Sequence, residues 1–177
     1  MSDPVLTGSR SLWRSARFAL ASEAFATVDG PVERPVIHHP GAVAIIAQPQ
    51  PDHLVLVRQF RYPVRRWTLE IPAGTRVPGE PPEVTAAREL REEAGLATTQ
   101  LIEVTRFFPA IGVSNEELII YRALALTEVP AAPEHGELVV REVVALADLP
   151  RLHREGLICD AKTLIAASLL GVALFRL

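Results

Sequence analysis

Three glutamates fall within five residues in the segment GEPPEVTAARELREEAGL, which spans residues 79–96. If this segment is helical, Glu89, Glu92 and Glu93 occupy its last two turns, where the partial negative charge of a helix C-terminus disfavours each carboxylate by roughly 0.3–1 kcal/mol. Glu89 and Glu93 are also four residues apart, so they repel each other. The cluster is either a solvated helix face or a cation site. Mg²⁺ and Mn²⁺ prefer such oxygen ligands and commonly bridge to substrate phosphates.

A helix over residues 81–94 would position these glutamates. Pro81 suits a first helical turn, strong helix formers follow it, and Gly95 lies where a left-handed residue ends a helix. Small or apolar residues recur every four positions on one face and would pack on a sheet, namely Ala86, Leu90 and Ala94. The spacing therefore predicts one buried face and one acidic face.

Apolar, partly β-branched runs on both sides of this helix predict strands. The clearest runs cover residues 42–47 and 54–60, and the turn residues between them predict a hairpin-like connection. Further strands are expected at 67–74, 101–108, 117–126 and 138–146, with a weaker one at 17–28 before an Asp29-Gly30 turn. Helices are expected within 147–156 and over 160–176, the latter capped by Asp160. The pattern predicts an α/β fold, a mixed β-sheet sandwiched between α-helices, with an N-terminal β-hairpin-like segment.

The composition indicates a single soluble domain. In 177 residues, 18 Lys and Arg against 21 Asp and Glu give a net charge of −3, too mild to indicate a nucleic-acid-binding surface. The single cysteine, Cys159, has no partner for an internal disulfide, so a cytoplasmic setting is expected. The most apolar run, residues 164–175, is shorter than the roughly 20 residues that cross a bilayer, so no membrane association is expected.

The spacing around the acidic helix resembles a known signature. From Gly74 the chain runs through five residues to Glu80, seven to Arg88-Glu89-Leu90, one to Glu92-Glu93, and one to Gly95-Leu96. Every fixed position is similar to the Nudix box, the signature of the Nudix hydrolase family. The resemblance implies a loop, helix and loop in an α/β/α sandwich, with carboxylates that hold Mg²⁺ or Mn²⁺ and thereby bind a substrate diphosphate.

The resemblance also implies which box residues hold the metal. The implied ligands are the backbone carbonyl of Ala73 and the side chains of Glu89, Glu92 and Glu93. Glu80 and Arg88 match the positions of a supporting salt bridge, so a structural role is expected for Arg88.

A general base must take a proton from the attacking water. In the related branch this base is often a loop glutamate just before a strand. Glu137 aligns best with it, and Glu134 is the alternative. A box glutamate, Glu92 or Glu93, also serves in some members, so the three choices stay open.

Several segments outside the box are similar to the ADP-ribose pyrophosphatase branch of the family. They are HPGAVAIIA, LVLVRQFRYPV, WTLEIPAG, PAIGVSNE and DAKTL. Arg58 and Arg61 stand in a segment that contributes substrate contacts in this branch, and guanidinium groups suit phosphate oxygens. A solvated strand end would carry the same arginines. Glu70 also recurs in the branch and is expected to help hold metal or substrate.

ADP-ribose is the first expected substrate, with AMP and ribose 5-phosphate as products. One departure concerns Ile111, which stands where the subgroup commonly has a proline, although Gly112, Ser114 and Glu116 keep the loop pattern. UDP- or GDP-sugars are therefore alternative substrates. A non-catalytic nucleotide sensor on the same fold is a further alternative, which the intact box glutamates disfavour.

The N-terminal segment, residues 1–34, is expected to form strands before a Nudix hydrolase domain over residues 35–177. In this branch the segment often crosses to a second subunit, so the resemblance implies a homodimer. Trp13, Phe18 and Phe25 would then contact the partner. The sequence equally allows these rings to pack within their own chain.

Overall fold

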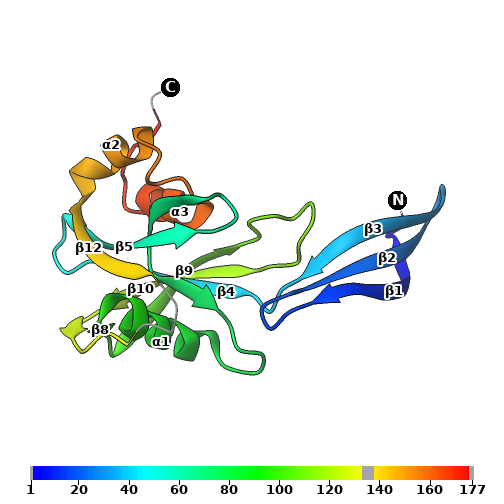
Figure 1. Ribbon diagram of the computed structural model, residues 1–177, viewed down its shortest axis with the longest axis horizontal. Coiled ribbons are helices and arrows are strands. Elements are labelled where there is room, and N and C mark those ends of the chain that lie inside the picture. Colours follow the sequence, from blue (N-terminus) through cyan, green and yellow to red (C-terminus); the bar gives the residue numbers. More distant parts are fainter. Residues whose placement is uncertain (1, 133–137, 176–177) are drawn as a thin grey trace. The chain divides into compact units, whose positions relative to one another are not determined.

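The computed structural model describes residues 2–132 and 138–175 (Figure 1). The chain forms two compact units. One comprises the chain up to Gly41 together with Phe107–Leu118. The other comprises Ala42–Arg106 and the chain from Ile119 onward. The predicted glutamate cluster lies in the second unit.

The first unit contains a three-stranded antiparallel sheet in the order β1-β2-β3. Its strands are β1 Val5–Arg14, β2 Ala19–Thr27 and β3 Gly30–His38. Thr27 pairs with Gly30 across a two-residue turn, and the φ of 113° at Gly30 suits glycine. The strand expected at 17–28 is thus confirmed, and the turn lies one residue earlier than expected, at Val28-Asp29. Strands were expected within residues 1–34, but no bounds were predicted for β1, which is exposed along its whole length and has no alternation of buried and exposed residues.

The strands of the second unit form two main sheets, β7-β4-β10-β9 and β12-β5-β6, and a small pair, β11-β8. Their bounds are β4 Ala42–Ala47, β5 His53–Arg61, β6 Arg66–Glu70, β7 Ala73–Thr75, β8 Leu96–Ala97, β9 Gln100–Phe107, β10 Leu118–Leu124, β11 Thr127–Glu128 and β12 Val139–Ala145. The helix α1, Pro82–Ala94, lies on one side of the sheets (Figure 1). A 3-10 turn, Leu146–Asp148, leads to α2, Leu149–Arg154, and α3, Ala161–Leu169, on the other side. The predicted α/β sandwich is confirmed.

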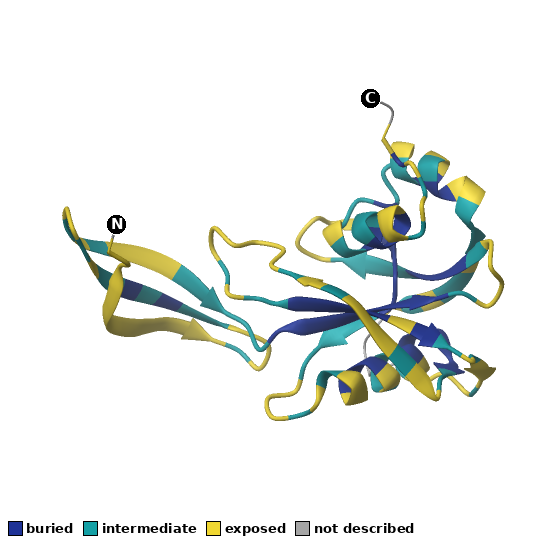
Figure 2. Ribbon diagram, turned by 180° about the vertical axis from the view of Figure 1, so that it is seen from behind, coloured by how far each residue is buried: buried dark blue, intermediate teal, exposed yellow. Residues whose placement is uncertain are grey.

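The predicted hairpin between residues 42–47 and 54–60 is wrong. Both strands exist, but β4 lies between β7 and β10, whereas β5 lies between β12 and β6. All of β4 and the segment Leu54–Val57 of β5 are buried (Figure 2). Strands buried on both faces are typical of a sheet interior, and their partners need not be neighbours in sequence.

The closing helix is shorter than predicted. It ends at Leu169, and Gly171 adopts a φ of 76°, a left-handed conformation that ends helices. The prediction followed the apolar residues to position 176 and passed over this glycine. At the other end, Asp160 accepts a hydrogen bond from the Thr163 amide at 3.1 Å, which confirms the predicted cap.

The apolar face of α1 packs as predicted. Ala86, Leu90 and Ala94 are buried in one cluster with the strand residues Val43 and Val55. This packing fixes the rotation of α1 and therefore the face on which its glutamates lie. Within residues 2–132 and 138–175, no helix is long and apolar enough to span a bilayer.

Candidate active site

A left-handed glycine and an arginine from β12 stabilise the C-terminal end of α1. Gly95 has a φ of 61°, the left-handed conformation predicted for it, and its amide donates to Arg91 O. Arg141 of β12 donates from Nη1 to the Ala94 carbonyl oxygen at 2.9 Å and also pairs with Glu128. A cation here offsets the partial negative charge of the helix end.

Arg88 lies among the carboxylates of α1. Its Nη1 atom is 2.8 Å from Glu89 Oε1 and 3.5 Å from Glu92 Oε2, and its Nη2 atom is 3.4 Å from Glu80 Oε2. Burial lowers the pKa of Arg88, but Glu89, Glu80 and Glu92 outweigh burial and raise that pKa. The structure therefore brings Glu80 and Arg88 together and places positive charge within the glutamate cluster.

The strand β7 contacts two of the glutamates. The Ala73 amide donates to Glu93 Oε2 at 2.9 Å, and Glu93 is buried. A Cβ atom at Gly74 would lie 2.0 Å from the carboxyl carbon of Glu89, so the absence of a side chain lets this carboxylate approach the backbone. The carboxylates of Glu89 and Glu93 thus lie against the backbone of β7.

This site fits a hard divalent cation by the chemistry of its donors. They are the carboxylate oxygens of Glu89, Glu92 and Glu93, and oxygen ligands are what Mg²⁺ and Mn²⁺ prefer. Among the residues that the structure describes, no three His, Cys, Asp or Glu side chains are already gathered at ion-binding distance. Because Arg88 already contacts Glu89 and Glu92, a cation would compete with Arg88 for these two carboxylates.

A second charged cluster surrounds Glu70 at the end of β6. Glu70 is 2% exposed and accepts hydrogen bonds from Arg61 Nε at 2.8 Å and Arg61 Nη2 at 2.6 Å. The Thr68 hydroxyl donates to Oε1 at 2.6 Å, and Lys162 of α3 donates to Oε2. Burial raises the pKa of Glu70, but the Arg61 hydrogen bonds and the charge of Lys162 outweigh it and lower that pKa to about 2. Each carboxylate oxygen of Glu70 thus has two donors.

Most of the chain matches one domain family. The NUDIX domain matches residues 37–164, a range that includes the whole box segment. The chain belongs to the Nudix family. The resemblance inferred from residues 74–96 is therefore confirmed, and α1 is the Nudix helix.

Three curated relatives resemble this Nudix chain over most of its length. The ADP-ribose pyrophosphatase of Bacillus subtilis is 37% identical over 76% of this chain and 74% of the relative. The methanol dehydrogenase activator of Bacillus methanolicus is 36% identical over 78% of this chain and 76% of the relative. The ADP-ribose pyrophosphatase of Mycobacterium tuberculosis is 40% identical over 73% of this chain and 63% of the relative.

A solved structure supports the Nudix fold. The crystal structure of an ADP compounds hydrolase has a TM-score of 0.81, with 97% of this chain and 94% of that chain covered. Its sequence is 23% identical, so this likeness shows the fold alone. The predicted fold class is confirmed.

The two predicted substrate arginines of this Nudix protein point to different faces of β5. Arg58 and Arg61 are three residues apart, and side chains alternate along a strand. Val55 shares a face with Arg61 and packs in the cluster that contains the Nudix helix. Arg58 lies on the opposite face, where it pairs with Glu142 at 2.5 Å. The structure therefore does not bring the two arginines together.

Other predicted site residues lie elsewhere. Glu134 and Glu137, the predicted loop bases, fall outside the described residues. Ile111 is 80% exposed in the loop before β10. The same loop is held by a hydrogen bond from the Ile37 amide to Val113 O at 2.8 Å. The exposed Ile111 side chain therefore contributes little to the packing of this loop.

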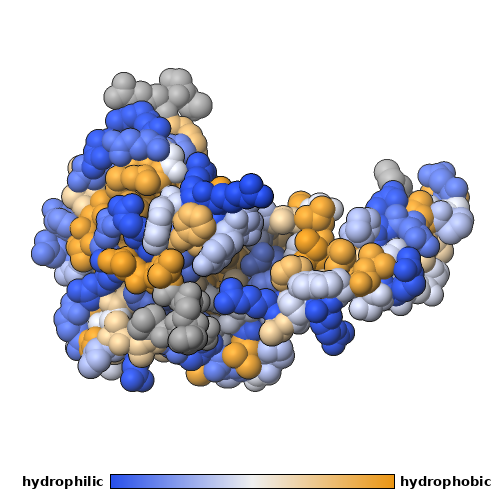
Figure 3. All heavy atoms as spheres, viewed as in Figure 1, coloured by the Kyte–Doolittle hydropathy of each residue, from blue (hydrophilic) through white to orange (hydrophobic). Residues whose placement is uncertain are grey.

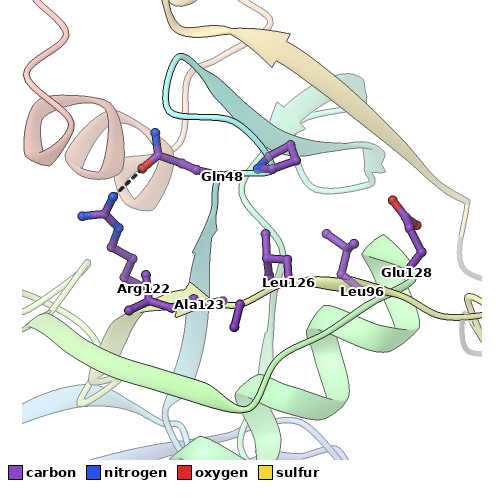
Figure 4. Close-up of a pocket in the computed structure, with 9 residues that line it drawn as sticks. Gln48, Leu96, Arg122, Ala123, Leu126 and Glu128 are labelled. Carbon is purple, nitrogen blue, oxygen red and sulfur yellow. Dashed lines mark hydrogen bonds between the residues drawn. The ribbon is translucent and has the colours of Figure 1, made fainter.

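A pocket of about 330 Å³ opens between the ends of β4 and β10 and the β8-β11 pair (Figure 4). Arg122 donates to Gln48 Oε1 at 2.9 Å on one side, and Glu128 lies on the other. Leu96, Ala123 and Leu126 lie between them. None of the predicted site residues lines this pocket.

Sequence reasoning missed three residues that contact the site or its supports. Arg141 bonds to the end of the Nudix helix, Lys162 to Glu70, and Thr163 to the Ile71 amide. Lys162 and Thr163 belong to the DAKTL segment. Its similarity to the ADP-ribose pyrophosphatase branch was the only signal in the sequence that could have identified them. A single arginine within a strand gives no comparable signal for Arg141.

Proposed function

We propose that this chain hydrolyses the diphosphate linkage of ADP-ribose to AMP and ribose 5-phosphate with a divalent cation. The observation that carries the proposal is the contact between the Nudix helix and the Ala73-Gly74 backbone, where Glu89 and Glu93 lie against β7. The names of two relatives, both ADP-ribose pyrophosphatases, support the choice of substrate.

The proposed cation ligands are the Ala73 carbonyl and the carboxylates of Glu89, Glu92 and Glu93. When bound, Mg²⁺ or Mn²⁺ would neutralise phosphate charge and make a coordinated water easier to deprotonate. The Ala73 amide already fixes Glu93, which lowers the cost of organising the site. The carboxylate proposed to take the proton from water is a box glutamate, Glu93 or Glu92, or a loop glutamate, Glu137 or Glu134.

We propose Arg61 as the principal phosphate contact. Its side chain is 38% exposed and leaves the face of β5 that packs toward the Nudix helix. Glu70 would act indirectly, because its two hydrogen bonds hold the Arg61 guanidinium in one orientation. Arg58 stays a predicted second contact, accessible only from the opposite face of the strand.

The first test is a substrate panel with Mg²⁺, comprising ADP-ribose, UDP-glucose, GDP-mannose, diadenosine polyphosphates and nucleoside triphosphates, with products resolved by chromatography. AMP and ribose 5-phosphate as leading products would support the proposal. Faster cleavage of a UDP- or GDP-sugar would favour the second candidate, which the isoleucine at position 111 suggests. Cleavage of none would favour a non-catalytic nucleotide sensor.

Glu93→Gln tests the cation assignment. Glutamine keeps an oxygen that accepts the Ala73 amide, so the fold should persist, but the negative charge is lost. We expect cation-dependent turnover to fall roughly 100-fold or more, with little change in the melting temperature. Glu103→Gln, on an exposed carboxylate paired with Arg106, is the matched control and should retain turnover. Unchanged turnover in Glu93→Gln would refute the metal assignment.

We further propose that the protein is a cytoplasmic homodimer whose N-terminal segment, residues 1–34, contacts the partner. Apolar side chains are exposed over the N-terminal strands, namely Val5, Leu6, Leu12, Trp13 and Phe18 (Figure 3). Exposed apolar patches commonly mark interaction surfaces. The cysteine Cys159 is unpaired, which agrees with a reducing setting.

A further inference from the structure

The first turn of α3 contacts the segment that leads into the Nudix site. Thr163 is fully buried, and its hydroxyl oxygen accepts a hydrogen bond from the Ile71 amide at 3.0 Å. Lys162 donates to Glu70 and also to Asp160 Oδ1 at 2.9 Å. Asp160 in turn caps the helix through the Thr163 amide. The turn therefore holds both Glu70 and Ile71.

The backbone that follows β6 carries this contact to the Nudix glutamates. The Leu69 amide donates to Leu157 O at 2.8 Å, and Pro72 O accepts from the Ile45 amide at 2.8 Å. The next residue, Ala73, donates to Glu93. Only Pro72 separates Ile71 from Ala73, and its ring fixes φ near −65°. Pro72 thus links the Ile71 amide, which Thr163 holds, to the Ala73 amide, which contacts Glu93.

We propose that Thr163 and Lys162 are positioning residues, which act through Ile71 and Glu70 to set where Ala73 and Glu93 stand. This inference rests on the proposed function, because the position of Glu93 affects turnover only if the glutamates hold a cation. The alternative is a purely structural role, in which the turn stabilises the fold without affecting the site.

A buried backbone amide without an acceptor is costly, so the segment moves when its acceptor is removed. Thr163→Val removes the acceptor at nearly constant volume. Thr163→Ser keeps the hydroxyl and is the rescue variant. Ala167→Gly is the control for stability, because Ala167 is buried on the same helix, is not among the partners of Ile71, and glycine weakens a helix.

The experiment measures Mn²⁺ binding to the otherwise metal-free protein by electron paramagnetic resonance, together with the melting temperature of each variant. We expect Thr163→Val to weaken Mn²⁺ binding by about tenfold, because a displaced Ala73 would hold the Glu93 ligand less well. Thr163→Ser and Ala167→Gly should stay within about twofold of the wild type. Unchanged binding in Thr163→Val, or an equal loss in Ala167→Gly, would overturn the proposal.

Amide hydrogen exchange at Ala73 separates this proposal from the proposed function. In protein without metal, Thr163→Val should accelerate Ala73 exchange by about tenfold relative to Thr163→Ser, because Ala73 no longer lies correctly against Glu93. If the wild type binds no Mn²⁺, the proposed function fails by itself. Ala73 exchange then decides the positioning role, and equal exchange rates in the two variants would refute it.

Discussion

At Glu70, a carboxylate is buried without being left unpaired. Removal of a charge from water costs several kcal/mol unless partners compensate it, and here Arg61, Lys162 and Thr68 do so. Because a buried ion pair is costly to break but adds little net stability, the cluster fixes geometry more than it stabilises the fold. The orientation of Arg61 is the property that the proposed function needs.

Glu70→Gln should remove a pH dependence of stability. The folded-state pKa of about 2 lies below the ordinary 4.5, so the stabilisation is fully present above pH 4.5 and is lost as the pH falls toward 2. In the wild type this group should account for roughly 3 kcal/mol of lost unfolding free energy over that interval. The variant should be less stable at pH 7, and its unfolding free energy should lack this pH-dependent contribution. Urea denaturation at pH 7, 4.5 and 3 measures the stability and its pH dependence. If the unfolding free energies of wild type and variant fell in parallel with pH, the lowered pKa of Glu70 would be contradicted.

At the scale of elements, local stereochemistry was predictable and strand pairing was not. The predicted helix 81–94 differs from α1 by one residue, because a proline and a glycine mark its ends. The runs AVAIIA and LVLVRQF were recognised as strands but belong to different sheets. A continuous apolar run shows that both faces are buried, but it does not identify the neighbouring strand.

In the candidate site too, contacts between neighbouring residues were predictable and contacts between distant segments were not. The box residues lie within 23 positions of one another, so their spacing alone predicts that they share one loop and one helix. Lys162 is 92 positions from Glu70, and Arg141 is 47 positions from Ala94. Such contacts depend on how the sheets assemble, and no local pattern marks them.

Gly74→Ala tests the close approach of β7 to α1. The added methyl group would overlap the Glu89 carboxylate, which is the flexible end of a side chain and would move aside. We expect a stability change within about 1 kcal/mol but a roughly 10- to 100-fold loss of cation-dependent turnover. Thermal denaturation and turnover over a range of Mg²⁺ concentrations measure the two effects. Full activity at low Mg²⁺ would show that the approach of Glu89 to the loop is dispensable.

At the scale of the whole molecule, the N-terminal sheet lacks a core of its own. Along β1, β2 and β3 only Ala21 and Glu23 are buried. A three-stranded sheet gains stability when it packs a hydrophobic face against another element. In the proposed homodimer, the exposed apolar residues of β1 would be covered by a second copy of the chain.

Trp13→Asp should separate the two subunits. The Trp13 side chain is 51% exposed, and its ring lies 5.1 Å from that of Phe18, so the pair offers a large apolar contact. We expect the wild type at micromolar concentration to have twice the chain mass of 19.3 kDa by size-exclusion chromatography with light scattering. The variant should dissociate about 100-fold more readily, because buried tryptophans often dominate interfaces. Leu169→Asp, at a residue outside the N-terminal segment that is 47% exposed, is the control and should stay dimeric. A monomeric wild type would remove the dimer proposal and leave the exposure of β1 to be explained by another partner.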